Sequence, residues 1–349
     1  MTDLLAVRYT TARTLTTGPA DSAQPGPGEV ELAPAYVGIC GTDLHIFHGD
    51  MDARVKTPAV IGHEMSGRVV RVGPGVDGFA PGDAVTVMPL RYDGTCPACV
   101  RGHQHVCQNL DFIGIDSPGA MQQRWTVPAD TLIPLPDSLP LDHAALVEPT
   151  AVAVHDVARA AVQSGERVLV VGGGPVGVLI ALVATAAGAQ VRVVEPSAHR
   201  RHLAGQLGLA AWDPAADDVP ALVQQWTGGA GADVSFEVSG AQAGVATAVD
   251  ALAVRARLCL VAIHPRPREV NLHRFFWREL TLIGARLYQR ADFETAVRLI
   301  AEGTIPAAQL ITKVVPLSET PTAFQALEAG GEMMKILIDC TSQDTGERA

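Results

Sequence analysis

The first part of the chain alternates short apolar runs with turn residues, and no helical period appears before Cys40. An apolar run over 30–37 predicts a β-strand, and a run over 84–88 predicts another after two turns that contain Gly and Pro. Short strands and Pro-rich turns continue over 119–136, and a helical pattern follows over 139–162. The N-terminal part is therefore predicted to be rich in β-structure.

The middle of the chain has a different pattern, in which β-branched runs alternate with helical stretches. Val168 to Val171 predict a strand that is buried on both faces. An apolar helix follows through Ala187, where Gly188 ends it, and Val191 to Val194 predict a second strand. The pattern then predicts a helix over 199–212, a strand over 234–240, a helix and a strand within 244–265, and a strand over 280–287. This alternation is typical of a doubly wound parallel sheet.

The C-terminal part returns to shorter elements. Amphipathic helices are predicted over 293–302 and 320–329, and a last strand over 331–340. The tail over 341–349 is expected to be frayed.

The first strand-to-helix turn of the middle part carries a nucleotide-binding pattern. Gly172, Gly174 and Gly177 form G-x-G-x-x-G between the predicted strand and helix, and Glu195 stands 18 residues after the last glycine. The first glycine allows a tight turn, the second leaves room for a pyrophosphate, and the third lets the helix pack closely on the strand. The N–H groups at the helix start face the phosphates, and the acid can bind both ribose hydroxyls of NAD. The pattern therefore predicts NAD binding, with NADP disfavoured because Glu195 would repel a 2′-phosphate.

Composition limits the class of protein. The chain has 349 residues, enough for two domains, with 48% hydrophobic and 18% charged residues. Its net charge of -11 and the lack of basic runs argue against nucleic acid or an anionic membrane as a partner. The start lacks a signal-peptide pattern, and the most apolar run, 168–187, is explained by the strand and helix, so a cytoplasmic location is expected. Three of the six cysteines are clustered, which favours metal ligands over a disulfide framework.

Two further segments are dense in groups that bind metals or move protons. The first, C-G-T-D-L-H, offers the Cys40 thiolate and the His45 imidazole, and the second places His63 beside Glu64. Zinc takes Cys, His and carboxylate ligands, and a catalytic zinc site keeps one position open. Any one of these residues could be an ordinary core or surface group, so the prediction depends on their combination.

Together these motifs resemble the zinc-dependent medium-chain alcohol dehydrogenases. The resemblance rests on C-G-T-D-L-H at 40–45, G-H-E at 62–64 with Gly67, V-E-P at 147–149 and the Gly-rich loop, and it covers essentially the whole chain. E-P-x-A-V-A at 148–153 is similar to the sorbitol, butanediol and threonine dehydrogenase branch. The resemblance implies a GroES-like catalytic domain over 1–150 and 286–349, a Rossmann domain over 151–285, and a homodimer or homotetramer.

The resemblance also implies roles for individual residues. Zinc would be held by Cys40, His63 and a carboxylate, and would lower the pKa of the substrate hydroxyl, while NAD accepts the hydride. Two carboxylates beside one zinc would not both bind tightly; by resemblance Glu148 is the better direct ligand, and Glu64 binds through water or exchanges with it. Thr42 and His45 resemble the family's proton relay, and Asp43 would orient a ligand. The implied cofactor contacts are Gly172, Gly174, Pro175, Val176, Gly177, Glu195, Arg200, Val261, Ala262 and Ile263.

A second zinc site is implied with one departure from the family. The family holds a structural zinc with four cysteines, and here Asp93 stands in the first place, before Cys96, Cys99 and Cys107. A carboxylate can ligate zinc, although a harder ligand should weaken a thiolate-rich site. A metal-free lobe and a redox role for Cys96 and Cys99 are the alternatives.

The predicted activity is hydride transfer between a secondary alcohol and NAD. Ile46 and Leu287 are apolar where sorbitol dehydrogenases carry polar aromatic residues, whereas Arg286 matches their substrate-side arginine. The substrate is thus a polyol, a diol, an amino alcohol or a sugar acid. The rival interpretations are a zinc-free reductase of the same superfamily and a non-catalytic nucleotide-binding protein.

Overall fold

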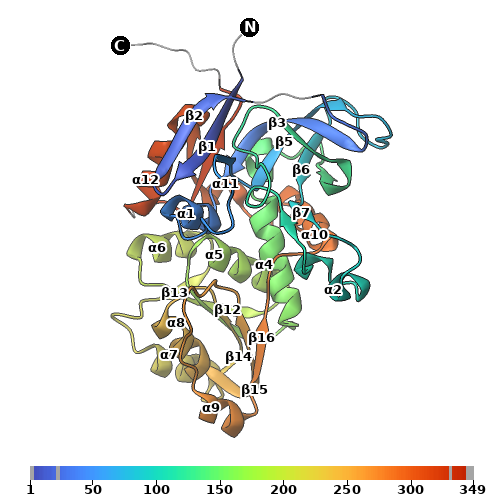
Figure 1. Cartoon of the computed structure of the whole chain (residues 1–349). Coiled ribbons are helices and arrows are strands. Elements are labelled where there is room, and N and C mark those ends of the chain that lie inside the picture. The colour runs from blue at the N-terminus through green and yellow to red at the C-terminus, as the bar shows by residue number, and fades with distance from the viewer. Residues whose placement is uncertain (1–3, 21–23, 330–331, 343–349) are drawn as a thin grey trace. The chain divides into compact units, whose positions relative to one another are not determined.

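The computed structural model describes residues 4–20, 24–329 and 332–342, and the chain divides into two compact units (Figure 1). The first unit comprises residues 1–148, 296–301 and 307–349, and the second comprises residues 149–295 and 302–306. Both ends of the chain therefore build the first unit. The predicted fraying over 341–349 falls mostly outside the described residues, which end at Ser342.

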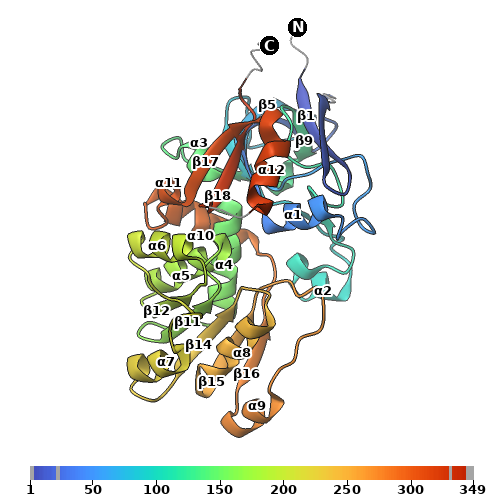
Figure 2. The ribbon, with the colours of Figure 1, turned by 90° about the vertical axis from the view of Figure 1, so that its left-hand side faces the viewer.

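The first unit is built mainly of antiparallel β-structure. Its sheets have the orders β10-β6-β5-β3-β18-β17, with β9 also paired to β3, then β2-β1-β4, and β7-β8. Strands β18 and β3 pair antiparallel, so the C-terminal segment joins a sheet begun about 300 residues earlier, and Figure 2 shows β17 and β18 beside α12. Its strands are β1 (Leu5–Thr11), β2 (Thr14–Pro19), β3 (Glu29–Gly38), β4 (Ala59–Val60), β5 (Glu64–Val72), β6 (Ala84–Val87), β7 (Leu90–Arg91), β8 (Asp111–Phe112), β9 (Trp125–Pro128), β10 (Leu132–Pro134), β17 (Ile311–Pro316) and β18 (Lys335–Asp339). Its helices are α1 (Gly41–His48), α2 (Pro97–Val100), α3 (Leu141–Ala144), α11 (Ala307–Leu310) and α12 (Thr320–Glu328), with short 3-10 turns η1 (Gln104–Val106), η2 (Ala129–Thr131) and η3 (Leu317–Glu319).

The second unit contains a six-stranded parallel sheet in the order β13-β12-β11-β14-β15-β16. The order reverses next to β11, which is the switch point of a doubly wound sheet. Helix α5 packs against β11 and β12, and its residues from Gly177 to Ala184 are all buried, as expected for such an apolar helix. The strands are β11 (Arg167–Val171), β12 (Gln190–Val194), β13 (Ala210–Trp212), β14 (Ala232–Glu237), β15 (Leu252–Leu260) and β16 (Thr281–Gly284). The helices are α5 (Pro175–Ala186), α6 (Ala198–Gln206), α7 (Val219–Thr227), α8 (Gln242–Asp250) and α9 (Leu272–Arg278). Helices α4 (Val147–Arg159) and α10 (Arg290–Ala301) contain residues of both units.

The predicted fold class is confirmed, with local corrections. The helix predicted over 199–212 is wrong at its end: α6 stops at Gln206, and β13 follows and pairs with β12. Gly208 has a φ of 77°, which ends the helical path. Helices α7 and α9 were not predicted. The sheet consequently has six strands where the sequence pattern predicted five.

Candidate metal and cofactor sites

The first candidate site lies where β3 leads into α1 and where β5 begins. Cys40 is the N-cap residue of α1, and its backbone N–H donates to Asp43 Oδ2 at 2.9 Å. β5 begins at Glu64, His63 immediately precedes it, and His63 and Glu64 are 2% and 1% exposed. One potential ligand atom each from Cys40, His63 and Glu64 lies within 4.8 Å of the others. Residues 23 positions apart in the sequence thus converge as a thiol, an imidazole and a carboxylate, a donor set that fits zinc.

Charge around this group is balanced by buried neighbours. Asp43 is fully buried, and its Oδ1 lies 3.6 Å from His63 Nδ1, so the carboxylate can orient the imidazole. Burial lowers the pKa of His63, but the negative charges of Asp43 and Cys40 outweigh it and raise the pKa above its ordinary value. Burial and the charge of Glu64 raise the pKa of the Cys40 thiol. These directions describe the metal-free protein, and a bound dication would favour the thiolate and the neutral imidazole.

Glu64 has a partner that the sequence analysis did not include. Lys335, on β18, donates its Nζ to Glu64 Oε2 at 2.6 Å and to the carbonyl oxygen of Ile39 at 3.2 Å. Lys335 is 3% exposed. Burial by itself would lower the pKa of Lys335, but the negative charges of Glu64 and Cys40 outweigh this effect. The pKa is therefore raised above its ordinary value, and Lys335 keeps its ammonium form. The only available signal was a lysine at the head of a buried apolar strand.

Glu148 lies at the beginning of α4 and is 4% exposed. Its negative charge acts on His63 and on Lys335, and it raises the pKa of both. It does not belong to the group of ligand atoms within 4.8 Å that contains Glu64. The geometry therefore groups Glu64, and not Glu148, with the thiol and the imidazole, and the sequence-based preference for Glu148 stays a prediction.

Thr42 and His45 both lie on α1, three positions apart, so they project from the same face of the helix. His45 Nδ1 lies 3.1 Å from Asp50 Oδ2, and the two side chains are 41% and 61% exposed. An imidazole at this position can exchange protons with water. Ile46, which the comparison with sorbitol dehydrogenases placed on the substrate side, is fully buried, and that placement stays a prediction.

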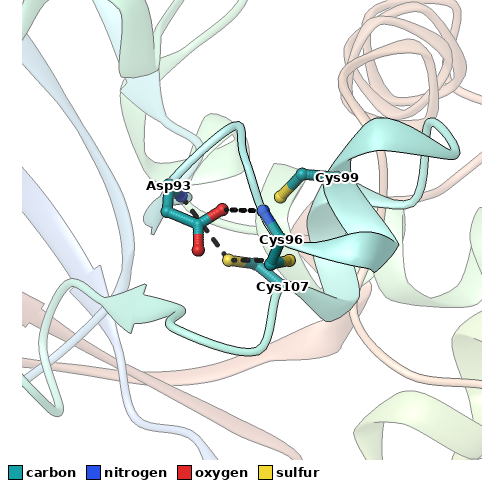
Figure 3. Close-up of side chains that lie close together, drawn as sticks. All are labelled: Asp93, Cys96, Cys99 and Cys107. Atoms are coloured by element: carbon teal, nitrogen blue, oxygen red, sulfur yellow. Dashed lines mark hydrogen bonds between the residues drawn. The ribbon is translucent and has the colours of Figure 1, made fainter.

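The second candidate metal site is the lobe around α2, shown in Figure 3. Asp93, Cys96, Cys99 and Cys107 each offer a ligand atom within 4.8 Å of the others, and the three cysteines are 5–7% exposed. Backbone N–H groups of Gln108 and Asn109 point at the sulfurs of Cys96 and Cys107, at 3.5 and 3.3 Å. All six cysteines are free thiols. The four side chains that the family resemblance implied as ligands are therefore brought together, and they fit a zinc ion.

The Asp93 carboxylate has partners of its own in this lobe. Oδ1 accepts from the backbone N–H groups of Thr95 and Cys96 at 2.8 and 2.9 Å, and Oδ2 accepts from Asn109 Nδ2 at 2.6 Å. These hydrogen bonds hold the pKa of Asp93 well below its usual range, and the bond from the Cys96 N–H has the largest effect. Hydrogen bonds from Gln108 and Cys99 lower the pKa of Cys96, whereas burial and the neighbouring thiols raise that of Cys99 to about 12.

The Gly-rich loop of the second unit has the geometry that its sequence predicted. Gly172 has a φ of 112°, and a Cβ there would meet the Ser239 backbone nitrogen at 2.9 Å. A Cβ on Gly177 would overlap the carbonyl oxygen of Gly172, so only glycine allows this packing. Gly174 is the N-cap of α5, and Pro175 and Val176 begin its first turn. Pro175 has no N–H group, so the N–H groups of this helix start that can bind phosphate begin at Val176.

Glu195 follows β12 and is 4% exposed. Its Oε2 accepts from the Gly173 N–H at 2.7 Å, and its Oε1 accepts from the Ser197 N–H at 2.8 Å. Arg200 Nη1 lies 4.0 Å from Oε2. The carboxylate is thus fixed beside the Gly-rich loop, as expected for a ribose-binding acid, with one cation close to it.

Val261, Ala262 and Ile263 follow the carboxyl end of β15, two strands from β11. The N–H groups of Val261 and Ala262 both donate to the Glu237 carbonyl oxygen, at 3.0 and 3.1 Å, and Ile263 is 68% exposed. His264 Nε2 lies 2.9 Å from Glu237 Oε2, a contact beside this loop that the sequence did not predict.

The sequence matches two family models. Residues 26–137 match the alcohol dehydrogenase GroES-like domain, and residues 175–302 match the zinc-binding dehydrogenase model. The chain is 45% identical to a 2-dehydro-3-deoxy-L-galactonate 5-dehydrogenase from Pseudoalteromonas atlantica over 97% of this chain and 100% of that protein. It is 37% identical to an L-threonine 3-dehydrogenase from Pyrococcus abyssi, over 89% of this chain and 91% of that one. A zinc-binding dehydrogenase structure from Sinorhizobium meliloti, bound to NADP, is similar with a TM-score of 0.91 and 28% identity over 97% of this chain and 100% of that chain.

The chain belongs to the zinc-dependent medium-chain dehydrogenases. The resemblance stated from the motifs is confirmed, and so are the GroES-like and Rossmann folds. The protein is accordingly an oxidoreductase of secondary alcohols that uses zinc and a nicotinamide cofactor. Among the described residues, no helix is long and apolar enough to cross a membrane.

Proposed function

We propose that this enzyme oxidises a secondary hydroxyl group of a sugar acid, with NAD as hydride acceptor. The observation that carries the proposal is the 45% identity, over the full length of the relative, to an enzyme that acts on a deoxy sugar acid. The threonine dehydrogenase is less similar, at 37% identity, and makes an amino alcohol the second candidate.

When bound, zinc and NAD would supply chemistry that side chains cannot, namely polarisation of the substrate oxygen and acceptance of the hydride. Cys40, His63 and Glu64 would hold this zinc, with Glu148 as the alternative carboxylate, because the first three bring ligand atoms within 4.8 Å of one another. Asp43 would fix the imidazole through its 3.6 Å contact. Thr42 would receive the hydroxyl proton and His45 would pass it toward water, which its exposed ring allows.

The Gly-rich loop would bind the pyrophosphate of the cofactor, and Glu195 would bind the ribose hydroxyls. Pro175, Val176 and Arg200 would line the adenosine side, and Val261, Ala262 and Ile263 would follow toward the nicotinamide. The fixed position of Glu195 supports NAD over NADP. Asp93, Cys96, Cys99 and Cys107 would hold a second, structural zinc.

The test of function is a rate comparison with NAD on four substrate classes: 2-dehydro-3-deoxy-hexonates and aldonates, polyols, vicinal diols, and threonine. We expect kcat/KM for the sugar acids to exceed the others by at least about tenfold, which corresponds to about 1.4 kcal/mol of transition-state binding. The Cys40→Ser variant serves as a matched control for activity that does not need the zinc site. A higher kcat/KM for threonine than for every sugar acid would contradict the proposed substrate.

We also infer a homodimer that joins two copies of β16. Among the described strands β16 pairs only with β15, so one of its edges is open, and Leu282 on it is 48% exposed. Nearby in the sequence, α9 exposes Phe276 and Trp277 by 78% and 73%. An open apolar edge favours pairing with another strand. Light scattering should show a dimer that Leu282→Lys dissociates, whereas Val314→Lys, on the edge strand β17 of the first unit, should leave it intact.

A cytoplasmic location stays a prediction that cell fractionation would test.

A further inference from the structure

We propose that Lys335 and Gly38 are positioning residues that fix the Glu64 carboxylate so that one of its oxygens faces the zinc site. The proposal rests on the proposed function, in which Cys40, His63 and Glu64 hold zinc. Neither Lys335 nor Gly38 was among the residues predicted from the motifs.

The register of three neighbouring strands brings these residues together. In the sheet of the first unit, β3 lies between β5 and β18, and Gly38 is paired with Glu64 on one side and with Leu337 on the other. The ladder continues past this row, because the Ile39 N–H donates to the Ile336 carbonyl oxygen at 3.1 Å. Lys335 and Glu64 therefore start on strands that are not adjacent, with the end of β3 between them.

Because Gly38 has no side chain, it leaves the space in which the side chains of Glu64 and Lys335 meet. A Cβ built on Gly38 would overlap Glu64 Oε2 and would lie 3.2 Å from Glu64 Cβ. The carboxylate therefore lies over the backbone of β3, in the space that any side chain at position 38 would fill. The φ of Gly38 is not in the left-handed region, so the requirement for glycine here is steric and concerns Glu64.

Lys335 fixes the far end of this arrangement. Its Nζ contacts Glu64 Oε2 at 2.6 Å and the Ile39 carbonyl oxygen at 3.2 Å, and the two charged side chains are 4% and 2% exposed. A buried ammonium without a partner is strongly unfavourable, which keeps the contact made. Since Oε2 accepts from Lys335, the proposal assigns Oε1 as the oxygen available to the zinc site. The positive charge also offsets the negative charge that Glu64 and Glu148 bring to the site, so a second carboxylate can be tolerated near it.

The test is a double-variant cycle read by zinc affinity, which does not depend on turnover. Apo protein is titrated with zinc against a chelator, and Cys40→Ser is run in parallel so that zinc bound by the cysteine-rich lobe can be subtracted. Lys335→Met should weaken zinc binding at the Cys40 site by about 10- to 100-fold, the usual effect of removing a group that orients a ligand. Lys335→Arg, which keeps the charge, should recover most of the affinity.

The second arm of the cycle distinguishes positioning from general stability. In a Glu64→Gln background, Lys335→Met should cause no further loss of zinc affinity, because the residue it orients is already changed. If Lys335→Met lowers zinc affinity equally in the wild-type and Glu64→Gln backgrounds, or does not lower it in the wild-type background, the proposal is overturned. Gly38→Ala, which displaces the carboxylate and leaves Lys335 in place, should reproduce the loss and should likewise have no added effect with Glu64→Gln.

The Gly38→Ala arm decides the question if Lys335→Met does not fold, as judged by circular dichroism of the apo protein. Comparison of the wild-type protein with Cys40→Ser distinguishes a failure of the proposed zinc site from a failure of the positioning role of Lys335 and Gly38. If both bind the same amount of zinc, the proposed zinc site is wrong, and the roles of Lys335 and Gly38 are overturned with it. If they differ by one zinc and the cycle shows no coupling, only the positioning proposal is overturned.

Discussion

Glu195 sets the expected preference for NAD, and Glu195→Gln tests this directly. Glutamine keeps the size of the side chain and removes its charge. The carboxylate accepts the Gly173 and Ser197 N–H groups through separate oxygens, and the glutamine amide can still accept one of them. The local loop should therefore persist while the repulsion of a 2′-phosphate is lost.

The magnitude follows from the burial of the acid and from the cation beside it. Two unit charges about 5 Å apart interact by about 3 kcal/mol at an effective dielectric of about 20. Arg200 offsets part of this, since its Nη1 lies 4.0 Å from Glu195 Oε2, although its side chain is 39% exposed and thus partly screened. A net change of about 1.4–2.7 kcal/mol corresponds to about a 10- to 100-fold gain in kcat/KM with NADP.

The assay compares kcat/KM for NAD and NADP with one substrate, in wild type, Glu195→Gln and Arg200→Gln. We expect wild type to favour NAD, Glu195→Gln to lose most of that preference through NADP, and Arg200→Gln to increase it. Equal use of NAD and NADP by the wild-type enzyme would refute the reasoning, and the similar structure that binds NADP makes this a real alternative.

Three further outcomes are expected. Asp93→Ala, made in the Cys40→Ser background, should lose most of the remaining zinc, because it removes one of four candidate ligands; unchanged zinc by elemental analysis would make Asp93 a purely structural acceptor. Gly177→Ala should lower the free energy of unfolding in urea by about 1–3 kcal/mol and weaken cofactor binding, since its methyl group would overlap the Gly172 carbonyl oxygen; an unchanged denaturation midpoint would contradict the tight packing. Cys259 should resist alkylation in the native protein at pH 8, because burial first, and then the charge of Asp156, raises its pKa to about 12, leaving almost no thiolate; rapid labelling located by mass spectrometry would show that the core opens.

Local patterns in the sequence were sufficient for the part of the second unit that runs from β11 through α5 to β12. The β-branched run before Gly172 and the apolar helix after it predict a buried strand and helix, because both patterns act over neighbouring residues. The same holds for Glu195, whose distance from the loop is fixed by one helix and one strand. The boundary of α6 was missed because the strand β13 is only three residues long and is stabilised by pairing with β12. Such pairing has no signal within the segment itself.

The cysteine lobe was also predictable, because three cysteines are clustered in the sequence and the resemblance to the family places Asp93 at the position of a fourth ligand. The zinc-site motifs were visible as well, and Cys40, His63 and Glu64 could each be named from the sequence. The sequence could not show which of the two carboxylates, Glu64 or Glu148, lies in one group with Cys40 and His63, and it could not show the partner of Glu64. Lys335 is 271 residues away from Glu64, and their contact depends on β18 pairing with one side of β3 while β5 pairs with the other. Sequence patterns report on residues that share an element, whereas charges on separate strands meet only through the register of the sheet. That register arises from the packing of the whole unit, which is why only the tertiary structure shows that this buried acid has a counter-ion.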